Sequence, residues 1–265
     1  MADREVTLSI FRFDPEKDKE GRFVDYKVPT VEGGMVVLDA VRYVQEKIDT
    51  TLAIRWNCKA ARCGSCSAEI NNRPALMCKT RIDTLGDRIT VAPMRAFPVI
   101  RDLVTDVDEN YRIMSKIPKF TVRKELMNPE AEGKKHQDVW RIQQINVERA
   151  KEFKKCIECF LCQDVCHVVR EHKSGYFGPP RHIVKAASLD MHPLDIVNRA
   201  KFLNEEGGLG YCNITKCCQE VCPEHIHITD NAIIPEKERA VDLQYDPLMH
   251  AIKRRLMKKR GETVA

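Results

Sequence analysis

The N-terminal part of the chain combines short alternating apolar patterns with one longer helical pattern. Residues 6–13 and 23–28 alternate apolar and polar positions on either side of a polar loop that contains Gly21, which predicts a β-hairpin. Residues 35–48 carry apolar side chains at intervals of three to four positions and predict a helix. Further strands are expected at 67–70, 73–78 and 88–92, with a turn at Asn71-Asn72. These elements predict a small sheet covered by one helix.

The C-terminal half favours helices. Residues 139–155 and 193–205 have helical periodicity, and Pro193 suits the first turn of a helix. Gly207-Gly208-x-Gly210 is expected to be a hinge or cap, because no strand precedes it and no phosphate-binding lysine follows it. The polar segment 107–138 is expected to be a linker. The chain is therefore predicted to be α+β, with domains at 1–106 and 139–265.

Cysteines identify the chemistry, because all 12 fall into three tight groups. The first group consists of Cys58, Cys63, Cys66 and Cys78. Its spacing is that of a plant-type [2Fe–2S] ferredoxin, which makes the N-terminal domain a β-grasp ferredoxin. The small residues Ala60, Gly64 and Ser65 are expected to let backbone amides approach the cluster sulfurs, one of the means by which a protein sets a cluster's potential.

The second group has the spacing of a bacterial ferredoxin run, and the third repeats it with one departure. The second group consists of Cys156, Cys159, Cys162 and Cys166. The third consists of Cys212, Cys217, Cys218 and Cys222, and Thr215 stands where the second cysteine of the run would be. The C-terminal domain is accordingly predicted to be helical and to resemble a bacterial ferredoxin with two clusters.

Ligand exchange between the two runs assigns their cysteines, because in two-cluster ferredoxins the last cysteine of each run binds the other cluster. The expected ligands of a [4Fe–4S] cluster are Cys156, Cys159, Cys162 and Cys222. Those of the remaining cluster are Cys166, Cys212 and Cys218. Three thiolates suit a [3Fe–4S] cluster, which leaves Cys217 out of register, either as a bland neighbour or as a fourth ligand.

Zinc and disulfides are the alternatives to iron. Structural zinc sites use two well-separated cysteine pairs, whereas four cysteines within eleven residues wrap a compact cluster. Disulfides are less favoured still, because the N-terminus has no secretory signal pattern. No stretch approaches the roughly 20 apolar residues of a membrane span. The net charge of +5 is spread along the chain and gives no reason to expect nucleic-acid binding.

The order of these groups resembles the iron–sulfur subunit of succinate dehydrogenase and fumarate reductase, with an actinobacterial-like second run. Segments beyond the cysteine spacing carry the resemblance: Arg55-Trp56-Asn57-Cys58, Cys63-Gly64-Ser65-Cys66, residues 97–104 (FPVIRDLV), residues 155–162 (KCIECFLC) and residues 222–226 (CPEHI). The similarity extends over nearly the whole chain.

The resemblance implies a relay of single electrons in a membrane-bound succinate:quinone oxidoreductase. A flavoprotein subunit with FAD would oxidise succinate, and electrons would pass through [2Fe–2S], [4Fe–4S] and [3Fe–4S] clusters to a quinone beside a membrane-anchor subunit, with or without haem. This chain would not turn over succinate alone, and it would lie peripherally on the cytoplasmic face of the membrane. The alternatives are a fumarate reductase subunit that runs in reverse and, more distantly, a zinc-stapled interaction protein.

The chain departs from the family pattern at the quinone end. Many relatives have proline after the last cysteine of the second run and histidine after the first cysteine of the third, whereas this chain has His167 and Asn213. We expect His167, with Arg170 or His172, to supply polar groups near the quinone, because an imidazole can donate to a quinone oxygen or relay a proton. A structural histidine is the alternative. Residues 247–260 form a basic amphipathic pattern that is expected to contact lipid headgroups or the anchor.

Overall fold

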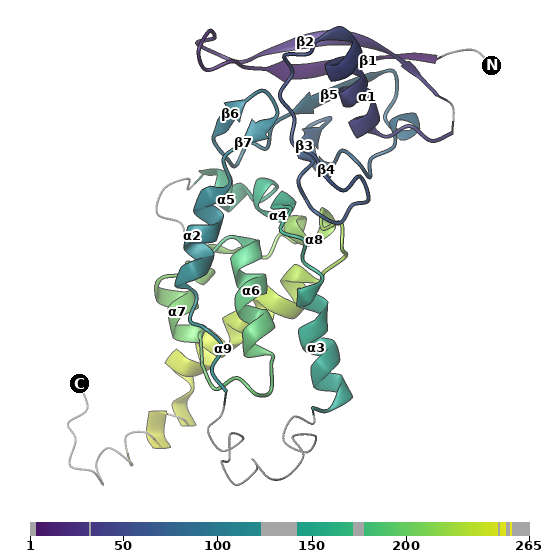
Figure 1. The fold of residues 1–265 in the computed structure, drawn as a ribbon. Coiled ribbons are helices and arrows are strands. Elements are labelled where there is room, and N and C mark those ends of the chain that lie inside the picture. The colour runs from purple at the N-terminus through teal and green to yellow at the C-terminus, as the bar shows by residue number, and fades with distance from the viewer. Residues whose placement is uncertain are drawn as a thin grey trace, which may run out of the picture.

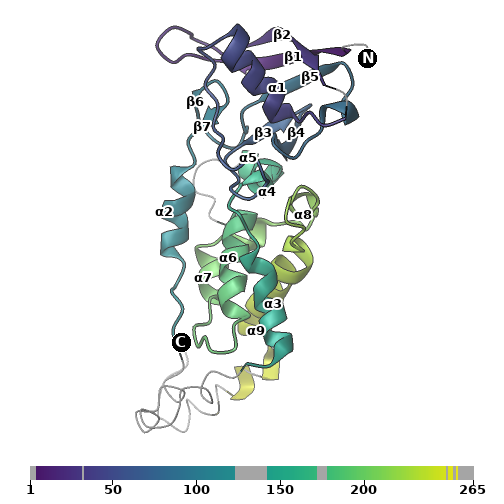
Figure 2. The same ribbon diagram turned by 45° about the vertical axis from the view of Figure 1, so that its right-hand side comes forward.

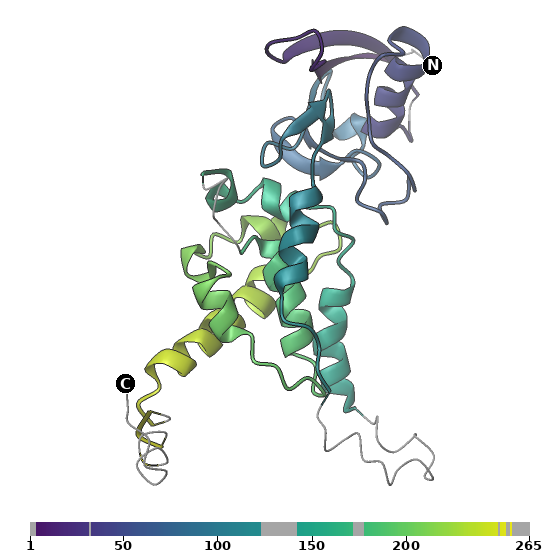
Figure 3. The same ribbon diagram turned by 60° about the vertical axis from the view of Figure 1, so that its left-hand side comes forward.

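The computed structural model describes residues 4–31, 33–122, 142–171, 178–248, 250–252 and 255. A sheet with its helix forms one end of the molecule and a helical domain the other (Figure 1). The two turned views show the same separation, with the helix α2 (Asp108–Lys116) running down the side of the helical domain (Figures 2 and 3).

The N-terminal domain is a mixed five-stranded sheet in the order β2-β1-β5-β3-β4. Its strands are β1 (Arg4–Arg12), β2 (Arg22–Thr30), β3 (Ser67–Ile70), β4 (Arg73–Leu76) and β5 (Arg88–Ala92). β1 pairs antiparallel with β2 and parallel with β5. A small hairpin of β6 (Val99–Arg101) and β7 (Val104–Thr105) follows. The predicted strands are therefore confirmed, with ends that differ by a few residues.

The predicted helix at 35–48 is present in two parts, α1 (Val37–Tyr43) and the π-helix η1 (Val44–Ile48). The residues at helical spacing on its inner side, Leu38, Val41 and Val44, are buried against Val6, Leu8 and other strand residues in one apolar core. Burial of about 25 cal/mol per Å² of apolar surface is the main force that holds this helix on the sheet.

The helical domain surrounds a second apolar core. Besides α2, its helices are α3 (Gln144–Lys154), α4 (Leu161–Asp164), α5 (His167–Glu171), α6 (Pro180–Asp190), α7 (Ala200–Glu205), α8 (Cys217–Glu220) and α9 (Ile234–Tyr245). Short turns of other helix types are η2 (Ile82–Thr84), η5 (Leu209–Tyr211) and η6 (Ile228–Ile233). Among the described residues, no helix is long and apolar enough to cross a membrane.

Helix boundaries in this domain differ from the prediction. α3 begins at Gln144 rather than 139, and residues 139–141 lie outside the described part of the chain. The predicted helix at 193–205 is wrong over its first half, because α7 begins at Ala200 and Pro193 lies in a turn. Instead, Asp195 pairs in extended backbone with Val122, and the amide of Ile196 donates to the carbonyl of Thr121 at 3.1 Å. A tertiary pairing thus replaces the local preference.

The segment expected to be a linker at 107–138 contains α2, which packs on the helical domain. The side chain of Asn110 is buried and accepts a hydrogen bond from Gln163 Nε2 at 2.7 Å, and its carbonyl lies 3.1 Å from His182 Nε2. Residues 123–138 lie outside the described residues. The domain boundaries at 106 and 139 stay predictions. The C-terminal pattern at 247–260 is described only in part, and in that part Leu248 and Ile252 are exposed.

Candidate cluster sites

The first three cysteines of the first group lie on a loop that runs into the β3–β4 hairpin. Cys58 is exposed, and its sulfur accepts hydrogen bonds from the amides of Ala60 at 3.4 Å and Arg62 at 3.3 Å. Lys59 and Ala61 have φ of 54° and 53°, so alternate residues of the loop are left-handed. Such an alternation turns successive N–H groups toward one point, a concavity that binds anions and iron–sulfur clusters. The expected approach of backbone amides to a ligand sulfur is therefore present.

The other cysteines of this group lie close to one another. Cys63 hydrogen-bonds with Cys58, while Cys66 lies just before β3 and Cys78 just after β4, within reach of each other. Burial raises the pKa of Cys66 to about 12. Burial acts in the same direction on Cys63, but hydrogen bonds from Ser65 and Cys58 outweigh it and lower its pKa to about 6. Neighbouring thiols of one site thus differ in how readily they ionise.

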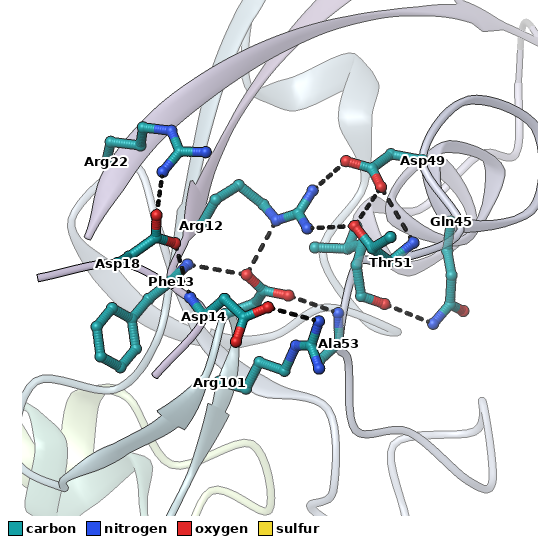
Figure 4. Close-up of polar contacts among 12 residues, drawn as sticks. Arg12, Phe13, Asp14, Asp18, Arg22, Gln45, Asp49, Thr51, Ala53 and Arg101 are labelled. Carbon is teal, nitrogen blue, oxygen red and sulfur yellow. Dashed lines mark hydrogen bonds and ion pairs between the residues drawn. The ribbon is translucent and has the colours of Figure 1, made fainter. Parts of the chain in front are cut away.

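A partly buried ion-pair network holds the chain that leads into this loop (Figure 4). Asp102, at the tip of the β6–β7 hairpin, accepts hydrogen bonds from Arg12 Nε at 2.9 Å and from the amide of Ala53 at 2.7 Å. Arg12 also contacts Asp49 and donates to Tyr26 at 2.8 Å. These partners raise the pKa of Arg12 although burial opposes the shift. The network therefore fixes residues 49–53 relative to β1, immediately before the cysteine loop.

The second and third cysteine groups share one backbone form. Glu158 and Phe160 have φ of 57° and 59°, and α4 begins at the next residue. Ile214 and Lys216 both have φ of 62°, and α8 likewise begins at the next residue. The two runs align with an offset of fifty-six positions, so Thr215 corresponds to Cys159 and Cys217 to Leu161. None of these left-handed residues is glycine, so no residue type in the sequence predicts them.

Two cavities separate the cysteines of these runs in the crossed arrangement expected from the sequence. One cavity is lined by Cys156, Cys159, Cys162 and Cys222. The other is lined by Cys166, Cys212, Cys217 and Cys218. Each cavity therefore meets the last cysteine of the other run.

The donor sets and the backbone both fit iron–sulfur clusters. Each cavity is lined by sulfur donors, and the alternating left-handed residues give the backbone form that turns successive amides toward one point. Burial raises the pKa of Cys159 and of Cys218 to about 12, so these thiols stay protonated until a metal displaces their protons.

Cys217 lies beside the position where a fourth in-register cysteine is missing. Its sulfur is 3.3 Å from Oγ1 of Thr215, and both residues line the third-group cavity. Cys218 is buried, with its sulfur 3.5 Å from Thr229 Oγ1. Cys217 thus comes from the same turn as Cys218 but points its sulfur toward the exposed threonine.

Of the residues proposed for the quinone end, the structure places one beside the third cavity. His167 is exposed, lines this cavity, and has Nε2 3.1 Å from Nδ2 of Asn213. Arg170 lies elsewhere: its Nε donates to the carbonyl of Asp164 at 2.5 Å, and its guanidinium is 3.7 Å from Glu69 of β3. It therefore joins the two domains. His172 lies outside the described residues.

Comparison with protein families identifies both domains. The family model of the 2Fe-2S iron-sulfur cluster binding domain matches residues 7–112, and that of the 4Fe-4S dicluster domain matches residues 152–226. The β-grasp and helical fold predicted from the sequence is therefore confirmed, and so are the [2Fe–2S] and [4Fe–4S] classes. An interaction protein held together by zinc does not agree with these matches.

Related proteins agree with the domain matches. The chain is 30% identical to the fumarate reductase iron-sulfur subunit of Haemophilus influenzae, over 83% of this chain and 88% of that protein. It is 31% identical to the protein of the same name from Mycobacterium tuberculosis, over 85% and 89%. A chain of the Mycobacterium smegmatis Sdh1 complex in the apo form has 54% identity and a TM-score of 0.84, over 93% of this chain and 99% of that one. The chain therefore belongs to the family of electron-transferring iron–sulfur subunits of succinate dehydrogenase and fumarate reductase.

Proposed function

We propose that this chain is the electron-transfer subunit of a membrane-bound succinate:quinone oxidoreductase. The observation that carries the proposal is the serial order of the cysteine sites. The first has an exposed ligand, Cys58, at the N-terminal domain; the second includes Cys159, which is buried in the core of that domain; and the third is lined by exposed residues of the helical domain, among them His167 and Asn213. Such an order gives electrons an entry, a protected middle and an exit.

The cysteines would hold three clusters. Cys58, Cys63, Cys66 and Cys78 would hold [2Fe–2S]; Cys156, Cys159, Cys162 and Cys222 would hold [4Fe–4S]; and Cys166, Cys212 and Cys218 would hold [3Fe–4S]. When bound, the clusters supply reversible one-electron chemistry, whereas the chain supplies their spacing, burial and hydrogen bonding. The common backbone of the two runs supports the three-ligand assignment, because it places Thr215 at the position of Cys159.

The entry face suits a flavoprotein subunit. Residues 55–60 are all exposed, and they include the first ligand, Cys58. The ring of Trp56 is covered by Arg42 at 4.5 Å and by Lys59 at 5.0 Å, so an aromatic surface is held beside the cluster loop with cations around it. A partner that docks here would exclude water from the first cluster and bring its flavin close.

The exit face suits a quinone at a membrane anchor. Tyr211 and Ile214 are exposed next to the third cavity, and His167 and Asn213 supply the neighbouring polar atoms. An imidazole at this point can donate to a quinone oxygen or relay a proton to it. The chain would thus lie on the cytoplasmic side of the membrane with this face toward the anchor subunit. That subunit would be one with haem or one without it.

Succinate oxidation is favoured over fumarate reduction by the mycobacterial Sdh1 chain, the structure with 54% identity. Several relatives near 30% identity carry the name fumarate reductase, which makes the reverse direction the second candidate. Midpoint potentials separate the two, because cluster potentials span about −700 to +450 mV and depend on hydrogen bonding and exposure.

Low-temperature EPR with iron analysis of the purified complex tests the proposal. We expect a nearly isotropic [3Fe–4S] signal after oxidation and a [2Fe–2S] signal after dithionite reduction. An oxidised sample without the first signal, which shows two interacting [4Fe–4S] clusters on reduction, would make Cys217 a ligand. Zinc in place of iron would contradict the whole proposal.

The quinone end has a separate test. His167→Ala should raise the KM for quinone and leave the EPR signals of all clusters unchanged. His227→Ala is the matched control, since His227 is an exposed histidine whose Nδ1 contacts Glu152 rather than the third cavity. Equal quinone kinetics in both variants would exclude His167 from the site.

A further inference from the structure

The ligand loops of the first and second sites touch one another directly. Gly64, in the turn between Cys63 and Cys66, has φ of +67°, and a Cβ built on it would lie 2.7 Å from Cys159 Cα and 2.9 Å from Cys159 Cβ. No side chain larger than hydrogen fits at this point without movement. The backbone of one ligand turn therefore rests against a ligand of the next site.

A buried hydroxyl joins the two loops at the same place. Ser67, the first residue of β3, is 7% exposed, and its Oγ lies 2.8 Å from the carbonyl of Gly64 and 2.9 Å from the carbonyl of Cys159. The single hydroxyl proton serves both acceptors, so the two carbonyls are held to one point. Without it, buried acceptors would lose their donor, at a cost of about 1–3 kcal/mol.

Packing on both sides prevents these loops from separating. Cys159 and Leu161 of the second run belong to the apolar core of the N-terminal domain together with Cys66. Lys79, which follows Cys78, donates to the carbonyl of Pro223, which follows Cys222, at 3.0 Å. Ligands of the first and second sites are therefore joined through their neighbours at more than one point.

We infer that Gly64 and Ser67 are positioning residues for electron transfer between the first and second clusters. In that step one electron leaves the reduced first cluster and enters the oxidised second cluster, and no bond is made or broken. Its rate falls steeply with separation, because it depends on tunnelling through the protein. Gly64 permits the close approach of the two ligand loops, and the hydroxyl of Ser67 holds the loops at that distance. The inference rests on the proposed cluster assignment and adds the residues that set one distance within it.

Matched variants of the whole complex test the inference. Ser67→Ala removes the shared hydroxyl, and Ser9→Ala is its control, a 2%-exposed serine on β1 of the same sheet. Gly64→Ala introduces the clashing Cβ, and Gly86→Ala is its control, because Gly86 has φ of +83° but open space around its Cβ position. Each control reproduces the chemical change without the contact between the loops.

Two measurements report on the distance rather than on turnover. One is the microwave power that half-saturates the reduced [2Fe–2S] EPR signal, which depends on relaxation by the neighbouring reduced cluster. The other is the rate at which an electron redistributes between the clusters after flash reduction. We expect Ser67→Ala to lower the half-saturation power and to slow redistribution several-fold, and Gly64→Ala to do so more strongly, with both controls unchanged.

Iron content and the EPR signal of each cluster separate the possible failures. With full cluster content, a Ser67→Ala complex that matches Ser9→Ala in both measurements overturns the inference. If Gly64→Ala loses the first cluster, Ser67→Ala alone decides. A wild-type complex without iron–sulfur signals overturns the proposed function itself, and this result is visible before any variant is compared.

Discussion

The second and third cysteine runs have the same backbone but opposite surroundings. In the second, Cys159 is buried in the core of the N-terminal domain, and the buried Phe160 contacts Phe97 of that domain. At the corresponding positions of the third, Thr215 and Lys216 are exposed. One local structure thus provides both an internal site and a terminal site, and the cysteine is missing from the run that faces outward.

The surroundings explain why the two runs tolerate different residues. The second run is sealed by the contact of Phe160 with Phe97 and Tyr111, at ring centroid distances of 6.0 and 5.8 Å. Asp164, which follows it in α4, accepts a hydrogen bond from the amide of Ala96 at 3.0 Å. A polar side chain in place of Phe160 would lose its water there, whereas Lys216 keeps its water and pairs with Asp230 at 2.7 Å.

The largest effect is expected from adjacent cysteines of the third run. Cys218→Ala should abolish the third-site EPR signal, because it removes the buried member of the three proposed ligands. Cys217→Ala should keep the signal and the iron content, since Cys217 corresponds to the non-ligand Leu161. The measurement is EPR of the oxidised complex with iron per chain. Loss of the signal in both variants would mean that the shared backbone form does not determine the ligands.

The comparison can be sharpened by making the third run resemble the second. Thr215→Cys places a thiol at the position of Cys159, so the third site should take up a fourth iron and lose its oxidised [3Fe–4S] signal. The iron content per chain should rise accordingly, and a [4Fe–4S] signal should appear on reduction. An unchanged [3Fe–4S] signal would show that exposure, rather than the missing ligand, determines the cluster type. Thr215→Ser is the control that keeps the hydroxyl.

Phe160→Ala and Lys216→Ala compare the surroundings directly, because both residues precede a short helix with left-handed backbone. Phe160 is 4% exposed, and its truncation should destabilise the contact between the domains by about 3–5 kcal/mol. Lys216→Ala should cost at most about 1 kcal/mol, because its ion pair is exposed. The urea concentration at which the visible circular dichroism of the [2Fe–2S] cluster is lost measures both. Equal urea midpoints for the two variants would show that the buried second run and the exposed third run do not differ in their contribution to stability.

What the sequence could predict follows from how local each feature is. The strands and the cysteine spacings are local patterns, so they located the sheet and all three ligand loops. The left-handed backbone at Glu158, Phe160 and Lys216 could not be predicted, because none of these residues is glycine. The closure of each ligand loop around its cavity requires this backbone form, whatever the residue type. The contact of Gly64 with Cys159 joins residues from two domains and has no sequence signature.

The error at 193–205 has a similar origin. Arg199 is fully buried, and it donates to the carbonyl of Pro118 at 2.7 Å and to Asp195 at the same distance. Those partners hold residues 195–199 in a non-helical path, although Pro193 and the apolar spacing favour a helix. For the site, Arg170 shows what sequence proximity cannot predict. Its position three residues after His167 suggested the quinone end, but its guanidinium lies beside Glu69 of the N-terminal domain.

The smallest predicted effect concerns pH and the scaffold behind the third run. Glu236 on α9 is fully buried beside Asp190, and burial, assisted by the Asp190 charge, raises its pKa to about 8. An unfolded glutamate has a pKa near 4.3, so the folded chain holds the proton more tightly. Its contribution to stability is therefore complete below about pH 4.3, declines as the pH rises toward 8, and changes no further above it.

Glu236→Gln should remove this decline, because the amide stays neutral at every pH. Between pH 6 and 8.5 the wild-type complex should lose on the order of 1–3 kcal/mol of stability that the variant keeps. The loss should affect the third run first, because η6 leads from Thr229, next to Cys218, into α9, whereas the second run is also held by the N-terminal domain. The loss is measured as the change in thermal midpoint between the two pH values, with the [3Fe–4S] EPR signal as the probe of unfolding. Glu238→Gln is the control, because it removes the same charge from the exposed side of α9. If stability falls equally with pH in the Glu236→Gln and Glu238→Gln variants, Glu236 is not the group responsible.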